Sequence, residues 1–398
     1  MRGGFATAQS SLAIPIVYGI YNADMKATVT LKIKLETTGQ ASQSLSETQQ
    51  AYVVALNYTS QVSFEKKVFN SVALHHFTYR DVREITKLPA NLACSARCVV
   101  AEAYKRDKEK HHRWKETAAV RYDARTLTVK LDQQHATLTT LDGRVRVKLI
   151  LSDYHRQYFD GTWGVEPTAT ISRKGRIWYL HLIITKDIPD SQSDGVIGVD
   201  SGIVRIATVN TGKTFNGGII KHIRERRFKQ RRDLQSARHK SRNQRRLLKR
   251  LAGKEKRAVD WLLWNVANEI VDEALKVDAG TIAVEDLKGI RARIRVAKKQ
   301  RLIHHGWPFS SLFLKTAHVA SRHGVKVESI DARNTSRTCR CGHVDKANRT
   351  TQSTFRCVVC GYSHNADYVA SHNVAARYVE RRCESVTTRP RVRPSGQG

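Results

Sequence analysis

Three acidic residues stand where their carboxylates could share divalent cations. Asp200 ends the apolar run that starts at Val196, Glu285 ends the run that starts at Thr281, and Asp367 opens a helical pattern. Strand ends form the ligand crevice of an open α/β sheet, and carboxylate oxygens suit Mg²⁺ or Mn²⁺. Two such ions can drive phosphodiester hydrolysis. A single acid at a strand end is commonly a cap or turn residue, so the predicted site requires that all three meet.

Four of the seven cysteines lie near the C-terminus at a spacing typical of a zinc ribbon. Cys339 and Cys341 form the first pair, and Cys357 and Cys360 form the second pair, with 15 residues between Cys341 and Cys357. Pairs at this separation commonly bind one Zn²⁺, and four free thiols are the alternative. The other cysteines show no disulfide framework, which predicts a reducing compartment, the cytoplasm.

The first pair is shorter than usual, because only Arg340 separates its cysteines. Two intervening residues normally form the turn that brings both sulfurs onto one ion. The loop could kink so that both cysteines bind, His343 could complete the site with Cys339, or the site could be partly empty. We expect four cysteine ligands.

The charge of the chain indicates a polyanionic partner. Its 69 Lys and Arg residues exceed its 36 Asp and Glu residues by 33, and residues 191–398 alone hold 42 basic against 18 acidic residues. Nucleic acid and an acidic membrane surface both fit such a field. No run approaches ~18 apolar residues, so nucleic acid is favoured and a membrane partner is not expected. A basic surface that serves only solubility remains the third alternative.

The basic excess is concentrated in residues 221–257, which hold 17 Lys or Arg against 3 Asp or Glu. The pattern from 221 to 279 predicts one long helix whose basic part follows a phosphate backbone. Its amphipathic second part predicts that Trp261 and Trp264 belong to the core. The candidate nucleic-acid-binding residues are Arg226, Arg227, Arg231, Arg232, Arg245 and Arg246.

The elements expected before this region are a strand, a helical block and a series of strands. Alternation from Thr28 to Leu35 predicts the strand, residues 46–118 have helical patterns, and several strands follow up to residue 188. This order predicts a β-barrel of residues 25–45 and 119–190 that carries the helical block as an insertion. Residues 1–24 are interpreted as an appended, disordered extension, and residues 383–398 as a disordered basic tail.

The motifs together resemble the TnpB family, the RNA-guided DNA endonucleases of insertion sequences and relatives of type V CRISPR effectors. The resemblance depends on motifs within residues 196–382, in the order of the family: Ile197-Gly-Val-Asp-Ser-Gly-Ile203, Val284-Glu-Asp-Leu-Lys-Gly289, Thr335-Ser-Arg-Thr-Cys-Arg-Cys-Gly342, Cys357-Val-Val-Cys-Gly361 and Asn365-Ala-Asp-Tyr-Val-Ala370, followed by Asn373. Residues 25–190 match the family only in length and layout.

The resemblance implies an α/β RNase H-like (RuvC) nuclease domain of residues 195–335 and 365–382, split by a zinc-ribbon insert of residues 336–364. It also implies that the barrel is a wedge domain and that residues 46–118 form a recognition lobe. The implied partners are a guide RNA derived from the transposon end and double-stranded target DNA, cut beside a short transposon-adjacent motif. Asp200, Glu285 and Asp367 occupy the catalytic positions of the family.

Three other functions compete with this interpretation. A guide-independent RNase H-like transposase or resolvase would use the same acids without RNA. A TnpB descendant that has lost cleavage would act as an RNA-guided repressor, but it would have no reason to keep three mutually repelling acids together. A zinc-ribbon transcription factor leaves the three acids unexplained.

Overall fold

The computed structural model describes residues 25–236, 241–287 and 307–387, and the chain divides into two compact units at residue 188. The predicted N-terminal extension, residues 1–24, lies outside the described residues. The predicted tail is partly wrong, because the last helix continues to Thr387. The rest of that tail lies outside the described residues. None of the helices in the described ranges is long and apolar enough to span a membrane.

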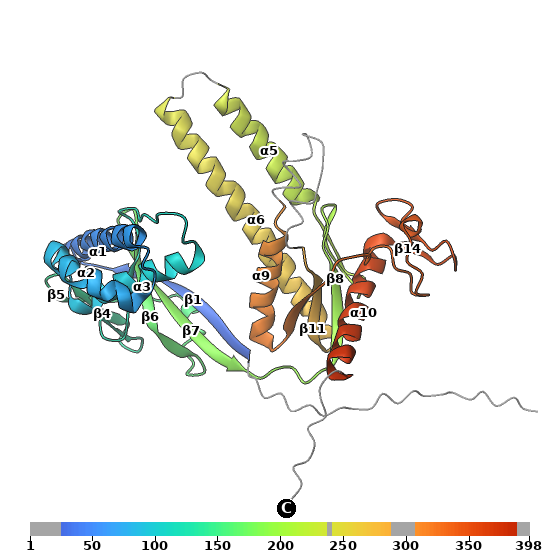
Figure 1. The fold of residues 1–398 in the computed structure, drawn as a ribbon, viewed down its shortest axis with the longest axis horizontal. Helices are drawn as coiled ribbons and strands as arrows, with labels where there is room; N and C mark the ends of the chain where they lie inside the picture. Colours follow the sequence, from blue (N-terminus) through green and yellow to red (C-terminus); the bar gives the residue numbers. More distant parts are fainter. Residues whose placement is uncertain (1–24, 237–240, 288–306, 388–398) are drawn as a thin grey trace, which may run out of the picture. The chain divides into compact units, whose positions relative to one another are not determined.

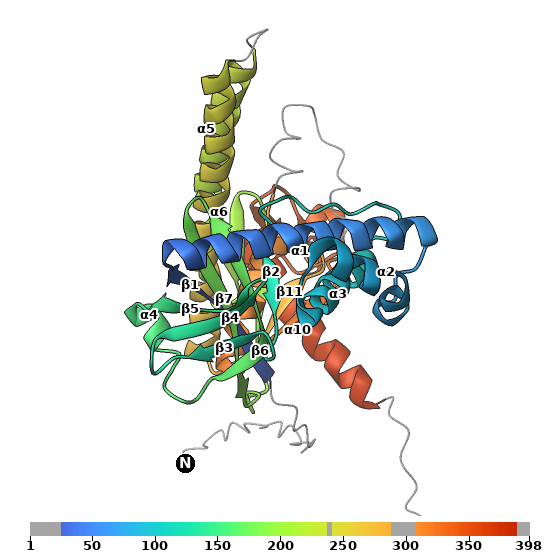
Figure 2. The ribbon, with the colours of Figure 1, turned by 90° about the vertical axis from the view of Figure 1, so that its left-hand side faces the viewer.

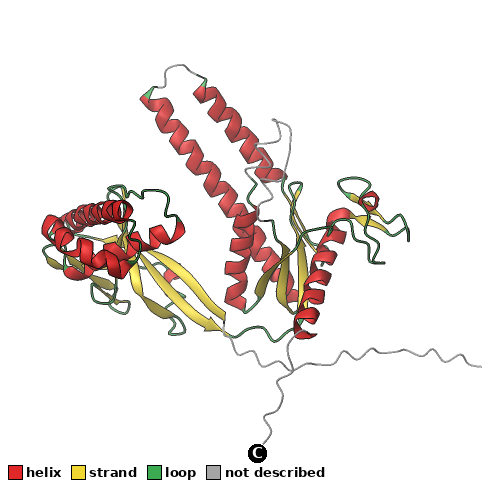
Figure 3. Ribbon diagram, in the orientation of Figure 1, coloured by secondary structure: helices red, strands yellow, loops and turns green. Residues whose placement is uncertain are grey.

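The first unit, residues 26–187, is built on one antiparallel sheet of seven strands (Figure 3). Its order is β2-β6-β7-β1-β5-β4-β3, and the end strands β2 and β3 leave it nearly closed instead of a complete barrel. The strands are β1 (Met25–Glu36), β2 (Val120–Tyr122), β3 (Leu127–Lys130), β4 (His135–Thr140), β5 (Gly143–Ile150), β6 (Gly164–Lys174) and β7 (Ile177–Ile188).

Three helices are inserted between β1 and β2, as the order of patterns predicts. They are α1 (Gly39–Lys66), α2 (Ser71–Thr86) and α3 (Ala90–Arg106), and a short α4 (Asp153–Arg156) follows β5. The predicted start at residue 46 is too late, because the Thr38 side chain caps α1 by accepting a hydrogen bond from the Ala41 amide. Residues 107–119 contain no helix, so the helical part also ends before residue 118.

Helix α1 connects the two halves of this sheet (Figure 2). Ser42 accepts a hydrogen bond from the Trp178 indole of β7, and the Thr48 hydroxyl accepts one from the Leu141 amide at the end of β4. The alternating apolar residues of β1, from Val29 to Leu35, are buried in the core between sheet and helices. The insertion is therefore part of the hydrophobic core of this unit.

The second unit contains a mixed five-stranded sheet of order β10-β9-β8-β11-β12. β8 (Gly195–Asp200), β11 (Ala279–Glu285) and β12 (Lys326–Ile330) are parallel, and β9 (Arg205–Val209) and β10 (Thr214–Asn216) continue the sheet antiparallel. β11 is apolar and buried over nearly its whole length, as expected of a strand covered on both faces. Figure 1 shows α6 (Arg242–Lys276) and α9 (Phe309–Ala320) on one side of this sheet and α10 (Ala366–Thr387) on the other.

The prediction of one basic helix from residue 221 is wrong. The segment forms two helices, α5 (Gly218–Gln235) and α6 (Arg242–Lys276), packed as a hairpin (Figure 1). Ser241 starts α6 with a capping box, in which its hydroxyl accepts from the Gln244 amide while the Gln244 side chain accepts from the Ser241 amide. This reciprocal pair satisfies two backbone donors and sets a helix start inside a continuously helical pattern.

Neither tryptophan of α6 belongs to the core, contrary to the prediction. Trp261 is 65% exposed and Trp264 is 38% exposed, whereas Leu263 and Ala267 are buried. Trp264 contacts the His318 ring of α9 edge-on, with 5.4 Å between centroids. Helix α6 therefore buries a narrower apolar stripe than its sequence suggests, because α9 covers only part of its apolar face.

Gly198, in the middle of β8, lets α10 approach the sheet closely. A Cβ atom at this position would lie 2.0 Å from the Ser371 carbonyl oxygen and 2.7 Å from the Ala375 amide nitrogen, both backbone atoms of α10. Contacts that short require the backbone to move. The glycine of the Ile197-Gly-Val-Asp200 motif therefore sets the distance between the strand that ends on Asp200 and the helix that carries Asp367.

We predict that Gly198→Ala destabilises the second unit by about 1–3 kcal/mol, the usual cost of overpacking. The movement of the α10 backbone that makes room for the new methyl group also displaces Asp367. Cleavage that depends on the three acids should therefore fall more than the loss of stability alone explains. Gly253→Ala in α6 is the matched control, since only a flexible Arg257 side chain lies near its Cβ position, and it should keep or raise stability. Thermal unfolding measures both variants, and equal unfolding temperatures for Gly198→Ala and wild type would contradict the close-packing role.

Candidate active site and metal centre

Asp200 and Glu285 lie side by side at one edge of the five-stranded sheet. They end the parallel neighbours β8 and β11, and Val199 of β8 is paired with Val284 of β11. Because the strands are parallel, the residues that follow this pair, Asp200 and Glu285, lie next to each other. Each ends an apolar run in the sequence, and in the fold they form one pair of carboxylates.

Helix α10 brings Asp367 to the same place. Asn365 caps this helix, because its side-chain oxygen accepts hydrogen bonds from the Asp367 and Tyr368 amides. Arg205 of β9 donates to that same oxygen at 2.6 Å. The Asp367 side chain is only 19% exposed, and its charge acts on both Asp200 and Glu285. The structure thus places the three predicted acids within electrostatic reach of one another.

The electrostatics of this site disfavour three free carboxylates. Burial raises the pKa of Asp200 well above its ordinary value, and the neighbouring charges of Glu285 and Asp367 raise it further. Burial also raises the pKa of Glu285, although a hydrogen bond from Thr335 opposes this rise. Positive charge is needed here for all three acids to stay ionised.

Two arginines, which the sequence did not identify, supply part of that charge. Arg205 lies 3.4 Å from Oδ2 of Asp367, and Arg349 lies 3.6 Å from Oδ1 of the same carboxylate. The charge of Arg349 also lowers the pKa of Asp200 and Glu285. Arg349 comes from the segment between the two cysteine pairs, where no spacing rule distinguishes it from the other basic residues.

A polar network fixes Glu285 and connects it to α10. The buried Thr335 hydroxyl donates to Oε1 of Glu285 at 2.6 Å. The Asn373 side chain of α10 donates to the carbonyl oxygens of Thr335 and Thr338, at 2.6 and 2.7 Å. Thr335 and Asn373 both belong to the sequence motifs, but their role as supports appears only in the fold.

The donor set of this site fits a hard divalent cation. It offers oxygen atoms from three carboxylates, and their burial and repulsion are the features that a bound cation would offset. In the described part of the chain, the only set of three or more metal-binding side chains tight enough for one ion is the cysteine set. The carboxylates would therefore have to move closer to bind an ion together.

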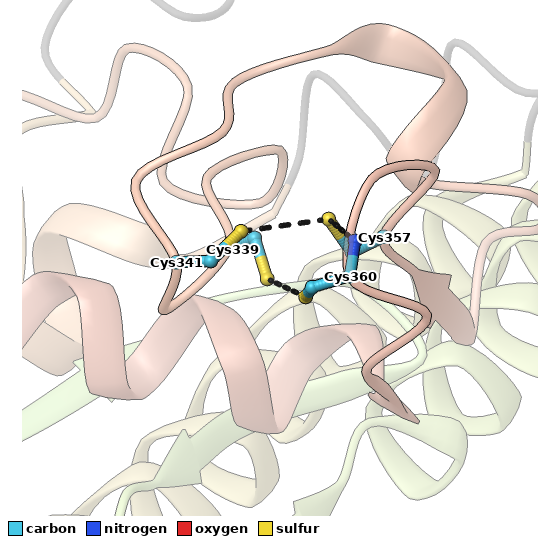
Figure 4. Close-up of side chains that lie close together, drawn as sticks. All are labelled: Cys339, Cys341, Cys357 and Cys360. Atoms are coloured by element: carbon cyan, nitrogen blue, oxygen red, sulfur yellow. Dashed lines mark hydrogen bonds between the residues drawn. The ribbon is translucent and has the colours of Figure 1, made fainter.

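The four predicted cysteines gather in one cluster (Figure 4). Their sulfur atoms all lie within 4.8 Å of one another, with 3.6 Å between Cys339 and Cys360 and 3.7 Å between Cys341 and Cys357. A tetrahedral zinc with Zn–S bonds of about 2.3 Å needs about 3.8 Å between sulfurs. The cluster has the size of a Cys₄ zinc site.

The shortened first pair reaches this cluster through a tight turn. The Gly342 amide donates to the Cys339 carbonyl, and the Cys339 amide donates to the His343 carbonyl, both at 2.9 Å. Gly342 has φ +87°, a conformation that favours glycine. The turn thus replaces the missing residue, so that Cys339 and Cys341 both point their sulfurs inward.

His343 is not part of the metal-sized group in this structure. Its carbonyl oxygen closes the turn by accepting from Cys339, so its visible contribution comes from the backbone. Burial raises the pKa of Cys339 to about 12, whereas amide hydrogen bonds, first from Cys360, lower the pKa of Cys357 to about 6. Cys357 is therefore more readily ionised than Cys339.

The six predicted nucleic-acid-binding arginines occupy both helices of the hairpin. Arg226 and Arg232 of α5 and Arg245 and Arg246 of α6 are exposed. Arg231 is half-buried and pairs with Glu255 of α6 at 2.6 Å, and Arg227 donates to Gln230. Arg231 thus contributes a contact between the two helices, which a sequence count of basic residues does not reveal.

Two family models match the chain. Residues 180–291 match a model described as a probable transposase, OrfB_IS605, and residues 309–374 match one described as Cas12f1-like, TNB domain. The first match contains Asp200 and Glu285, and the second contains the cysteines and Asp367. The predicted resemblance to the TnpB family is confirmed.

Individual proteins give the same result over part of the chain. The chain is 29% identical over 251 residues to the CRISPR-associated endodeoxyribonuclease Cas12f1 of Syntrophomonas palmitatica, covering 51% of this chain and 49% of that protein. It is 27% identical over 247 residues to the TnpB-like protein MJ0751 of Methanocaldococcus jannaschii, covering 58% and 85%. The chain thus spans about half of the length of that Cas12f1 protein.

A solved structure shows a similar fold. The cryo-EM structure of a Cas12f1–sgRNA–target DNA complex aligns with a TM-score of 0.62 and 16% identity, covering 85% of this chain and 83% of the Cas12f1 chain. At this identity the likeness concerns the fold.

We predict one zinc per chain, held by the four cysteines. Cys357→Ser should lose the metal, because it removes one of four ligands and the cysteine whose pKa is lowered. His343→Ala should keep it, because only the backbone of His343 takes part in the turn. Elemental analysis of the purified variants measures both. Zinc retained in Cys357→Ser would reject the ribbon, and zinc lost in His343→Ala would reject this ligand set.

Proposed function

We propose, from the resemblance of this chain to TnpB and Cas12f1 proteins, that it is an RNA-guided, divalent-metal-dependent DNA endonuclease. Its guide would be an RNA derived from the transposon end, and its substrate would be double-stranded DNA beside a short transposon-adjacent motif. In such systems base pairing selects the target and the protein reads only a short flanking motif.

The convergence of Asp200, Glu285 and Asp367 carries this proposal. Three acids from two strands and a distant helix lie within electrostatic reach of one another. Their burial and mutual repulsion disfavour the charged carboxylates, and nucleic-acid binding alone does not require this arrangement. A protein that only binds nucleic acid gains nothing from this repulsion.

The layout supports an RNase H-like (RuvC) nuclease domain of residues 195–335 and 365–382. The mixed sheet has helices on both faces, and the cysteine segment of residues 336–364 interrupts the chain between β12 and α10. In this proposal the first unit is the wedge domain, with α1 to α3 as its recognition lobe.

Each residue of the site has a chemical role in this proposal. Asp200, Glu285 and Asp367 would hold Mg²⁺ or Mn²⁺, and ions bound there would supply water activation and stabilisation of the leaving oxygen for an in-line displacement. Thr335 orients Glu285 through its hydroxyl, and Asn373 holds the Thr335 loop. Arg349 places positive charge over the carboxylates, where it can also meet the phosphate to be cut.

A guide-independent nuclease is the second candidate, because the same three acids would serve it. It differs in one observable respect. Removing RNA from the purified protein would leave its cleavage unchanged, whereas a guided enzyme should stop cutting and regain activity with its own RNA. A cleavage-deficient repressor would bind the same DNA without cutting it.

We predict that Asp200→Ala abolishes Mg²⁺-dependent cleavage while RNA and DNA binding remain nearly unchanged. Without metal its stability should equal or slightly exceed that of wild type, because one repelling carboxylate is gone. Asp194→Ala, at the opposite end of β8 and 83% exposed, is the matched control and should cut normally.

The experiment uses protein purified with its bound RNA. That RNA is sequenced, and plasmids that match it are offered as substrate with Mg²⁺ or with EDTA. Full-rate cutting by Asp200→Ala would reject the site, and absence of any specific bound RNA would reject the guided mechanism.

Exposed arginines of the helical hairpin should provide salt-dependent affinity. We predict that replacing Arg226, Arg232, Arg245 and Arg246 with glutamine weakens RNA binding and flattens the log–log salt dependence. Each lost phosphate contact should reduce the slope by about 0.7–0.9. Arg231 stays unchanged to preserve its pair with Glu255. Binding titrations at several salt concentrations measure the slope, and a change in the target sequence that is cut would contradict a purely backbone-contacting role.

A further inference from the structure

Thr208, in strand β9, has a buried hydroxyl group that lacks a hydrogen-bond partner in the described part of the chain. The residue is only 1% exposed, and no described donor or acceptor lies within hydrogen-bond distance of its Oγ1 atom. Burying a hydroxyl group without a partner is unfavourable, and buried polar groups in proteins are nearly always hydrogen-bonded. This exception therefore needs an explanation.

Several other buried threonines satisfy their hydroxyl groups locally. Thr48 and Thr78 each donate to the carbonyl oxygen one helical turn back, at 2.7 and 2.6 Å. Thr140 donates to the Gly143 carbonyl across the turn between β4 and β5. Thr208 lacks such a choice, because β9 is paired with β8 on one side and with β10 on the other, so that the ladder engages the nearby carbonyls. Among the described residues it is the only threonine whose buried hydroxyl has no partner.

The side chain of Thr208 lies on the same face of the sheet as that of Asp200. The two residues are direct partners in the antiparallel pair of β8 and β9. Side chains of such partners point to the same face, with Cβ atoms about 4.5–5.5 Å apart. This face is the one covered by α10, because Gly198, two residues before Asp200, faces the α10 backbone. The unpartnered hydroxyl is therefore beside the proposed metal site.

Asp200 is also the one acid of the three that lacks a supporting donor among the described side chains. Thr335 donates to Glu285 at 2.6 Å, and Asp367 is paired with two arginines. Asp200 is affected only by burial and by neighbouring charges, and no described side chain donates a hydrogen bond to it. Carboxylates that bind metal ions are usually hydrogen-bonded as well. An acceptor without a donor thus lies next to a donor without an acceptor.

We propose that the Thr208 hydroxyl donates a hydrogen bond to Asp200 when a divalent cation is bound, and so positions this carboxylate on the ion. Rotation of the two side chains can close the contact, because the ladder holds their Cβ atoms about 4.5–5.5 Å apart. Thr208 is a positioning residue, since it acts through Asp200 and does not itself bind the ion. The inference rests on the proposed function in that it takes the three acids to be a cation site.

The first experiment measures Mn²⁺ binding by electron paramagnetic resonance, in which the signal of free Mn²⁺ falls as the ion binds. The full chain is used as purified, and only the Mn²⁺ that Asp200→Ala fails to bind is assigned to the carboxylates. Thr208→Val replaces the hydroxyl with a methyl group and should weaken this binding about tenfold. Thr208→Ser keeps the hydroxyl and should bind nearly as the parent does.

Thr281→Val is the matched control, because it makes the same change at another buried threonine of the same sheet. Thr281 is 6% exposed and lies in β11, four residues before Glu285. Its affinity for Mn²⁺ should equal that of the parent. Weaker binding in this control, parental binding in Thr208→Val, or failure of Thr208→Ser to restore binding would each overturn the proposal.

Thermal unfolding separates positioning from a structural role. Without divalent cations, Thr208→Val should unfold at the temperature of the parent or higher, because an apolar group replaces an unpaired buried hydroxyl. Mn²⁺ should raise the unfolding temperature of the parent more than that of the variant, because the tighter ligand stabilises the folded state more at a given concentration. A variant that is already less stable without Mn²⁺ would assign Thr208 to the fold and overturn the proposal.

These outcomes are distinguishable from failure of the proposed function, because the measurements need neither added guide RNA nor cleavage. Equal Mn²⁺ binding by the parent and by Asp200→Ala would reject the carboxylate site, and with it both the metal-dependent cleavage and the role of Thr208. Binding at the carboxylates that is unchanged in Thr208→Val would reject the role of Thr208 alone. Weakened binding in Thr208→Val of a protein that never cuts with RNA would keep that role and reject the guided endonuclease.

Discussion

Burying carboxylates beside one another is the constraint on which this structure depends. Desolvation and mutual repulsion both disfavour the charged forms of Asp200 and Glu285, so the rest of the fold must hold these groups together against a tendency to separate. Two parallel strands, paired in register from Thr281 to Val284, fix the first pair through a backbone hydrogen-bond ladder, which side-chain repulsion cannot easily distort. The third acid needs a separate anchor, because it comes from a helix.

Helix α10 provides that anchor in three ways. Its backbone lies directly over Gly198, its start is fixed by the Asn365 cap, and Asn373 ties it to the loop that supports Glu285. The cysteine cluster lies immediately before this helix and delivers Arg349 to Asp367. A metal in the cysteine cluster would thus act on the carboxylates at a distance, by fixing the segment that carries this arginine.

Positive charge has two different uses in this molecule. At the carboxylates, Arg205 and Arg349 are partly buried and oppose a specific repulsion. Along α5 and α6, exposed arginines together create a positive field to which no single residue is essential. Arg231 differs from them, because it is partly buried against Glu255. Basic residues that are alike in the sequence thus differ in function according to what each one faces.

The sequence by itself determined the identities of the three acids and four cysteines, the order of strands and the inserted helical block. It could do so because strand periodicity, metal-ligand spacing and apolar runs are local properties of the chain. The tertiary structure decided what depends on contacts between distant residues: the capped break between α5 and α6, the exposure of Trp261, and the supporting roles of Thr335, Arg205 and Arg349. It also decided that a turn through Gly342 brings Cys339 and Cys341 into one cluster, because a shortened spacing allows several ligand sets until the backbone conformation selects among them.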